Sequence, residues 1–167
     1  MLRYKTLIGR FEAISFPEYG LTEVPAKIDT GAYNSSIHAT HIREVTKKDG
    51  TKVLNCILLG NHPVGDASQE VTFDSYDTIT VENSFGHKQE RYRVVMKVKM
   101  AGKVFTTRFT LADRSTKPFP VLLGRTLLNK RFIVDTQLSN VKRADLKKKL
   151  TKWQHQSGID NLDEDMV

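Results

Sequence analysis

The stretch that decides the fold is Ile28-Asp29-Thr30-Gly31-Ala32, residues 28–32 of the chain. It follows the β-rich run 24–28, and this pattern predicts a strand that delivers one carboxylate, that of Asp29, to a turn. Threonine holds such a loop through local hydrogen bonds, and glycine lets backbone approach the carboxylate because it has no Cβ. Taken alone, an Asp-Thr-Gly triplet also fits an ordinary turn capped by its Asp side chain. A second motif is needed to distinguish an active-site loop from such a turn.

That second motif is Val121-Leu122-Leu123-Gly124-Arg125, in which bulky apolar residues precede a Gly-Arg pair. A short helix is expected from Gly124 through about Asn129. With Asp-Thr-Gly early and Leu-Leu-Gly-Arg late, the chain resembles the retropepsins, the dimeric aspartic proteases of retroviruses. In that fold the apolar strand passes beside the Asp-Thr-Gly loop. The resemblance therefore implies that Asp29 is the catalytic residue and that its loop is supported by Thr30, Gly31, Ala32, Leu123, Gly124 and Arg125.

The rest of the sequence contains many short strand patterns and few helical ones, which predicts an all-β, closed barrel. An Asp49-Gly50 pair marks a hairpin turn. We expect a barrel domain over residues 1–140 and a basic C-terminal helix with an acidic tail over 141–167. The expected strands are 4–16, 24–28, 42–45, 52–59, 71–73, 78–81, 91–99, 104–111 and 132–134, and the expected C-terminal helix is 141–153.

A closer resemblance is to a bacterial family named as ATP-dependent zinc proteases, which has a retropepsin-like domain. Four motifs between about Leu7 and Asn140 carry it: Ala26-Lys27-Ile28-Asp29-Thr30-Gly31-Ala32, Ser35-Ser36-Ile37-His38-Ala39, Leu122-Leu123-Gly124-Arg125 and Val134-Asp135. The resemblance implies a peptide or protein substrate. It also implies an association with an ATP-grasp ligase that adds glutamate to a ribosomal protein.

Aspartic proteases need two carboxylates that share one proton, because two adjacent carboxylates do not both ionise. The chain has a single Asp-Thr-Gly, and its near-copy, Asp135-Thr136-Gln137, lacks the glycine. The first hypothesis is therefore a homodimer that pairs two Asp29 residues across a two-fold axis. By resemblance, the flap that closes over substrate is placed at Asn83, Ser84, Phe85, Gly86 and His87.

One position departs from the retropepsin pattern. Retropepsins carry an acidic residue two places after the Asp-Thr-Gly glycine, and it pairs with the arginine of the Gly-Arg motif. Here that place is taken by Tyr33. A different partner for Arg125 is expected, and the sequence leaves three candidates open: Glu44, Asp113 and Asp135.

Two histidines are candidate zinc ligands. His38 and His41 are three residues apart, which places them on opposite faces of a strand, and the chain has no His-Glu-x-x-His motif. We expect His38 to be a hydrogen-bonded structural residue, and neither a metal nor a cofactor is expected. Zinc-dependent hydrolysis with His38, His41 and Asp29 as ligands is the third hypothesis.

Composition limits the class of protein. The chain of 167 residues has a net charge of +7 and one cysteine, Cys56, which we expect in the core. No apolar run is long enough for a membrane helix and no signal peptide is visible, so a cytoplasmic protein without membrane contact is expected. The segment Lys142–Lys152 is strongly basic. The second hypothesis is therefore a non-catalytic module that binds a ribosome-modifying ligase or RNA, although such a segment is more often a solvated helix face.

Overall fold

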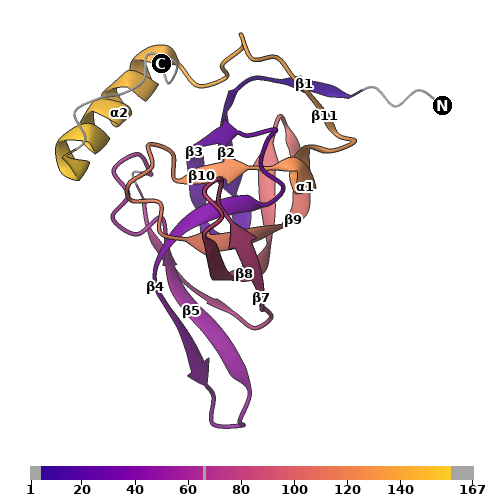
Figure 1. Cartoon of the computed structure of the whole chain (residues 1–167), viewed down its shortest axis with the longest axis vertical. Helices are drawn as coiled ribbons and strands as arrows, with labels where there is room; N and C mark the ends of the chain where they lie inside the picture. Colours follow the sequence, from indigo (N-terminus) through magenta and orange to yellow (C-terminus); the bar gives the residue numbers. More distant parts are fainter. Residues whose placement is uncertain (1–4, 66, 159–167) are drawn as a thin grey trace.

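A computed structural model describes residues 5–65 and 67–158, and its centre is a closed ring of strands (Figure 1). Each strand of the ring is hydrogen-bonded to the next, and β10 closes it by pairing in parallel with β3 and antiparallel with β4. This arrangement confirms the predicted all-β, retropepsin-like barrel. The strands follow one another around the ring as β10 (Val121–Leu123), β3 (Leu21–Ile28), β2 (Phe11–Phe16), β8 (Lys88–Met100), β9 (Lys103–Ala112) and β4 (Ser35–Thr46).

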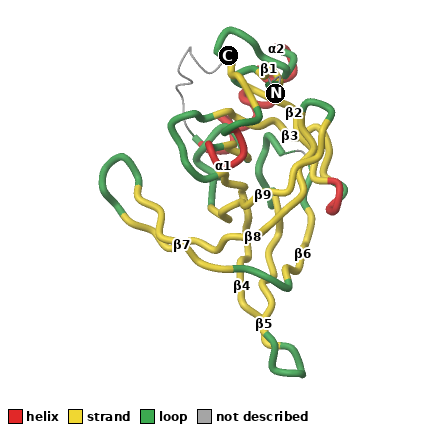
Figure 2. Tube along the Cα trace, turned by 90° about the vertical axis from the view of Figure 1, so that its right-hand side faces the viewer, coloured by secondary structure: helices red, strands yellow, loops and turns green. Residues whose placement is uncertain are grey.

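The remaining elements extend or cover this ring. Figure 2 shows two long hairpins that leave the barrel in different directions, one made by β4 and β5 and one by β7 and β8. Two short strands, β1 and β11, pair in parallel as a separate sheet. The bounds are β1 (Thr6–Ile8), a 3-10 turn (Pro17–Tyr19), β5 (Lys52–Leu58), β6 (Gln69–Phe73), β7 (Asp77–Glu82), α1 (Arg125–Leu128), β11 (Phe132–Val134) and α2 (Arg143–Ser157).

The first predicted strand is interrupted at Gly9. A Cβ on Gly9 would lie 2.3 Å from the carbonyl oxygen of Leu138, so the chain crosses another backbone there and turns. The buried carboxylate of Glu12 stabilises this crossing, because its Oε1 accepts hydrogen bonds from the Gly9 N–H at 2.7 Å and the Asn140 side chain at 2.6 Å. The expected strand 4–16 is therefore two strands, and Tyr4 lies outside the described residues.

A second apolar cluster attaches α2 to the barrel. Phe11 and Phe119 stack with their ring centroids 4.8 Å apart, and α2 covers them with one face, which includes Trp153. The Trp153 indole also donates a hydrogen bond to the Ser115 carbonyl at 2.9 Å. The helix is thus fixed to the barrel end, and the acidic tail predicted after it lies outside the described residues. The α2 residues of this cluster are Leu146, Leu150 and Trp153.

Cys56 is buried in the barrel core, where burial raises the pKa of its thiol to about 12. It is therefore a neutral packing residue at physiological pH, in agreement with the prediction. Over the described part of the chain, the helices are too short and too polar to span a membrane.

Candidate active site

The loop after β3 holds the Asp29 carboxylate through its own backbone. Asp29 Oδ1 accepts hydrogen bonds from the N–H groups of Gly31 at 2.9 Å and Ala32 at 3.1 Å. The Asp29 N–H donates to the Leu123 carbonyl at 2.9 Å, which joins the loop to β10. Both loop hydrogen bonds therefore fall on one carboxylate oxygen of a partly exposed side chain. The Asp-Thr-Gly motif and the Leu-Leu-Gly-Arg motif therefore lie side by side.

Arg125 binds the loop through backbone oxygens. One guanidinium nitrogen donates to the carbonyls of Thr30 at 3.1 Å and Gly31 at 2.9 Å, and the guanidinium carbon lies 5.9 Å from the centre of the Tyr33 ring. Among the described residues, no carboxylate lies within 4 Å of this side chain, so the candidates Glu44, Asp113 and Asp135 are not its partners. The Tyr33 ring occupies the position at which retropepsins carry an acidic residue.

Gly124 lets the β10 end pass against the loop. A Cβ there would lie 2.5 Å from the Asn34 carbonyl oxygen and 2.9 Å from the Ala32 carbonyl oxygen, both of which are backbone atoms. The Gly124 N–H donates to the buried hydroxyl of Ser35 at 3.1 Å. Any side chain at this position would clash with the loop backbone, which explains why the third residue of the Leu-Leu-Gly-Arg motif is glycine.

Arg114 lies within electrostatic range of Asp29, and Arg91 lies within range of Arg114. The pKa of Arg114 is lowered to about 10, mainly by burial and also by the positive charge of Arg91, while the negative charge of Asp29 acts in the opposite direction. Burial also lowers the pKa of Arg91. Arg91 lines a cavity of about 450 Å³ between β4, β8 and the end of β9. Arg114 therefore places a partly buried cation near the Asp29 carboxylate, with Arg91 as the electrostatic neighbour of Arg114, and neither arginine was among the predicted site residues.

The comparisons with known proteins fall on this same region. The model of the family described as "RimB-like: Retropepsin-like aspartic endopeptidase RimB" matches residues 7–145. The chain belongs to the RimB-like family. The barrel, the Asp29 loop and the Leu123-Gly124-Arg125 strand end all lie inside the matched region, whereas most of α2 lies beyond it.

Relatives of this RimB-like chain include longer proteins. A "Probable alpha-L-glutamate ligase" of Desulfotalea psychrophila is 31% identical over 161 residues, which cover 92% of this chain and 34% of the relative. A protein of the same name from Shewanella pealeana is 28% identical over 134 residues, covering 78% and 28%. The chain thus spans about a third of the length of these relatives. A crystal structure of a Legionella pneumophila protein of unknown function (DUF785) superposes with a TM-score of 0.62 at 26% identity, covering 81% of this chain and 97% of that one.

The expected flap residues form the tip of the β7–β8 hairpin of the RimB-like domain. Asn83 Oδ1 accepts hydrogen bonds from the N–H groups of Phe85 and His87, both at 3.0 Å, and Gly86 adopts a left-handed φ of 80°. Phe85 is 85% exposed. Figure 2 shows this tip projecting from the barrel. The residues expected to form the flap are therefore at a hairpin tip, and closure of that tip over a substrate stays a prediction.

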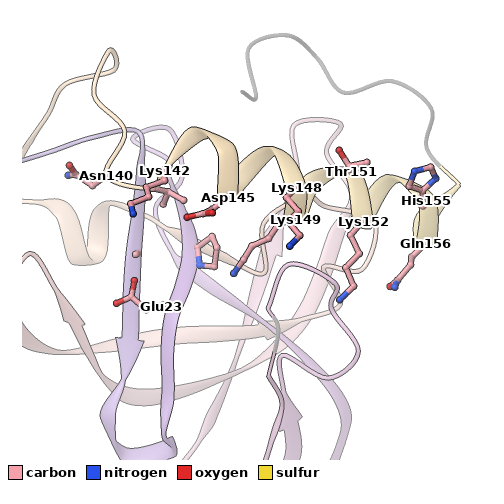
Figure 3. Close-up of a pocket in the computed structure, with 13 residues that line it drawn as sticks. Glu23, Asn140, Lys142, Asp145, Lys148, Lys149, Thr151, Lys152, His155 and Gln156 are labelled. Carbon is pink, nitrogen blue, oxygen red and sulfur yellow. The ribbon is translucent and has the colours of Figure 1, made fainter.

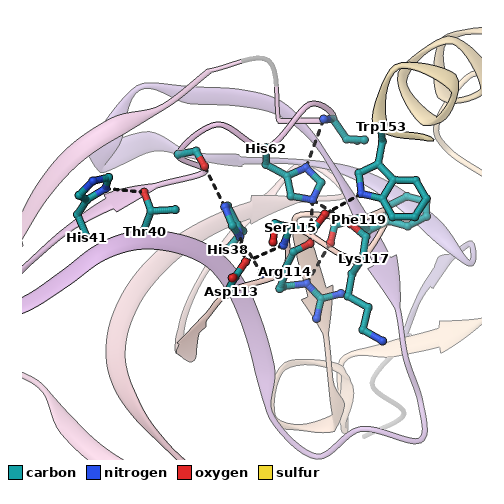
Figure 4. A network of polar contacts seen from close by, with 12 residues as sticks. His38, Thr40, His41, His62, Asp113, Arg114, Ser115, Lys117, Phe119 and Trp153 are labelled. Carbon is teal, nitrogen blue, oxygen red and sulfur yellow. Dashed lines mark hydrogen bonds and ion pairs between the residues drawn. The ribbon is translucent and has the colours of Figure 1, made fainter. Parts of the chain in front are cut away.

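His38 has both ring nitrogens engaged by backbone (Figure 4). Its Nδ1 accepts from the Arg114 N–H at 2.8 Å, which requires the proton on Nε2, and Nε2 lies 2.9 Å from the Gly60 carbonyl oxygen. His41 is exposed and contacts Thr40. In the described part of the chain no group of three or more His, Cys, Asp and Glu side chains is placed to hold a metal, so these donors do not form a zinc site.

A second histidine, His62, continues this network. The ring centroids of His38 and His62 are 5.1 Å apart, and His62 Nε2 donates to the Lys117 carbonyl at 2.9 Å. Asp113 belongs here too, with Oδ1 3.8 Å from His38 Nδ1 and accepting from the Ser115 N–H at 2.9 Å. The network fixes the segment after β9, which carries Arg114. The sequence signal that could have indicated this segment is the polar run directly after the predicted strand 104–111.

Proposed function

We propose that this protein is an aspartic endopeptidase whose catalytic unit is a homodimer, with one Asp29 from each copy. The observation that carries the proposal is the Asp29 loop itself, held by its own N–H groups and by Arg125 at the end of an apolar strand. Membership of a family described as retropepsin-like aspartic endopeptidases supports it. One such loop per chain supplies half of the pair of carboxylates that this chemistry needs.

In the proposed dimer the two Asp29 carboxyl groups share one proton, because their proximity splits their pKa values. The ionised group takes a proton from water, whose oxygen attacks the peptide carbonyl carbon. The protonated group donates its proton to the carbonyl oxygen. When the tetrahedral intermediate collapses, the amide nitrogen takes the proton that the first Asp29 had accepted from water, and the C–N bond breaks. The other Asp29 takes a proton from a hydroxyl of the intermediate, which yields a free amine and a free carboxylic acid and restores the pair with one shared proton.

Self-association is the first test. Sedimentation velocity over a concentration series should show a monomer–dimer equilibrium, and specific activity on a fluorogenic peptide should rise with the dimer fraction, since a monomer lacks the second carboxylate. The same series with Asp29→Asn should show the same dimer and no cleavage. A monomer whose specific activity is constant at every concentration would contradict the proposal.

We further propose that the protein works with a glutamate ligase. The relatives described above carry a region similar to this chain within a protein three times as long that is named as an alpha-L-glutamate ligase. A peptidase and a ligase in one polypeptide would act on the same peptide, one adding residues and the other removing them. The substrate expected from this pairing is a peptide with glutamate side chains.

The two arginines suit such a substrate. Burial is the main cause of the lowered pKa of Arg114, and the positive charge of Arg91 lowers it further; an acidic side chain bound between the two arginines would relieve that repulsion. Arg91 also lines the cavity between β4, β8 and the end of β9. We therefore assign Arg91 a role in selecting acidic peptides.

Replacing Arg91 by glutamine should raise KM for a glutamate-containing peptide about tenfold and leave kcat nearly unchanged. The variant loses a positive charge that binds the substrate, whereas the catalytic Asp29 carboxylate is unaltered. The matched control is Arg43→Gln, which removes an exposed arginine whose nearest acid is Glu70 at 4.0 Å. Steady-state kinetics on paired peptides with Glu or Gln would show the effect on the Glu peptide alone. An equal change on both peptides would contradict the assignment.

A further inference from the structure

A groove of about 1000 Å³ lies between α2 and strands β2 and β3. Figure 3 shows side chains of α2 reaching across it toward the strands. Its apolar surface comes from Ala13, Pro25 and Val141. Among the described residues that line it, none belongs to the Asp29 loop, so the groove is a separate feature from the candidate active site.

One wall of the groove is a stripe of basic side chains on α2. Lys148 and Lys152 are four residues apart and therefore lie on the same side of the helix, one turn from each other. The neighbouring stripe, which includes Leu150, packs on the barrel and fixes the direction in which the lysines point. Lys142 extends the positive wall beyond the start of the helix. The wall is thus held in place by the same packing that attaches α2.

The opposite wall carries Glu23, whose backbone has a left-handed φ of 52°. Glu23 lies where the pairing of β2 with β3 shifts register, and this β-bulge accounts for its conformation. Asp145 places a second carboxylate at the helix start. The groove therefore presents both signs of charge, with the cations in excess and gathered on the helix side.

We propose that this groove binds an acidic segment of a partner polypeptide in an extended conformation. Alternate residues of an extended chain are about 6.6 Å apart and the turns of an α-helix about 5.4 Å, so alternate carboxylates come close to the spacing of Lys148 and Lys152. The apolar residues of the opposite wall accept the small side chains between them. Glu23 is placed to accept hydrogen bonds from N–H or ammonium groups of the same segment.

The charge pattern favours an acidic peptide over a nucleic acid. A nucleic acid carries a charge at every nucleotide, so Glu23 and Asp145 would face phosphates. A peptide with alternating acidic residues also presents backbone N–H groups, from which these two carboxylates can accept hydrogen bonds. Proteins that bind single strands also use aromatic rings or arginines to stack on bases, whereas the described groove residues include no arginine and a single aromatic ring, that of His155 in the last turn of α2. The region matched by the family model ends at residue 145, so it includes the strand wall of the groove and leaves out Lys148 and Lys152.

Binding is tested on full-length Asp29→Asn protein, which separates it from cleavage. A fluorescein-labelled peptide of alternating Asp and Ala residues serves as the probe, followed by fluorescence anisotropy. The Lys148→Gln/Lys152→Gln variant should raise Kd about fivefold, since two partly exposed ion pairs are lost. The matched control, Lys99→Gln/Lys103→Gln, removes the same charge from the exposed β8–β9 turn and should leave Kd unchanged.

Two further measurements decide between explanations. Ala13→Glu adds a carboxylate to the groove without altering α2, and it should weaken binding by at least the same factor. Arg43→Gln, which removes an exposed charge from β4 outside the groove, should have no effect on this probe. Equal binding of an Asn-Ala peptide, equal loss in the control pair or tighter binding of an oligouridine of the same length would each overturn the proposal. Because cleavage is absent from the assay, failure here leaves the peptidase proposal standing.

Discussion

Asp29→Asn should lower kcat/KM for peptide cleavage about 10³-fold or more while leaving the fold intact. An amide does not take a proton from water at neutral pH, so the pair of carboxyl groups loses both its base and its proton donor. The asparagine side-chain oxygen still accepts the hydrogen bonds that Asp29 Oδ1 receives from Gly31 and Ala32. Initial rates of peptide cleavage and thermal unfolding of the same samples measure the two effects separately.

The matched control is Asp135→Asn. Asp135 is also followed by threonine, and its Oδ1 accepts a hydrogen bond from the Gln137 N–H at 2.9 Å, so the same kind of turn is altered. The exposed Asp135 should be replaceable without loss of rate. If Asp29→Asn retained the rate of the unaltered protein on a purified substrate, the proposed chemistry would be wrong.

The Asp-Thr-Gly and Leu-Leu-Gly-Arg motifs were enough to predict the barrel because the two motifs lie together only when the barrel is formed. Leu123 has to lie against the Asp29 loop, and a barrel closed through β10 is the way this chain achieves it. The start of β4 was not predicted, since Ser35-Ser36 resembles loop sequence. In the structure Ser35 is buried, pairs with Phe109 of β9 and accepts the Gly124 N–H. Polar residues in a strand become recognisable only when their partners are known.

The site was predictable where its residues are adjacent in sequence and not where they converge from distant segments. Arg125 was identified by its motif, but its partners are the carbonyls of Thr30 and Gly31, and sequence patterns of side chains do not reveal backbone acceptors. The interactions of Arg114 with Asp29 and with Arg91 join three separate segments of the chain. Periodicity placed Arg91 on a strand without indicating which cavity that strand lines.

The stability of the protein should fall between pH 7 and pH 5 because of the buried histidines. Burial lowers the pKa of His62 to about 4 from 6.5, and burial also lowers the pKa of His38. Below pH 6.5 the unfolded chain binds a proton at His62 that the folded chain does not bind, so stability is lost as the pH falls. The loss continues until the folded state itself binds the proton near pH 4. For His62 alone the expected change in the free energy of unfolding is about 2 kcal/mol between pH 7 and pH 5.

Urea unfolding at a series of pH values measures this loss, and His62→Gln should flatten the dependence between pH 7 and pH 5. The variant is also less stable at pH 7, because the hydrogen bonds to the Lys117 carbonyl and from the Val64 N–H are altered; the slope is therefore the readout. His41→Gln, which changes an exposed histidine, should leave the slope unchanged. As the pH falls, structure should be lost first in the segment after β9. His38 and His62 both bind the backbone of this segment, and Arg114 lies within it. A variant with the same pH slope as the unaltered protein would show that other groups cause the loss and that His62 is protonated without cost.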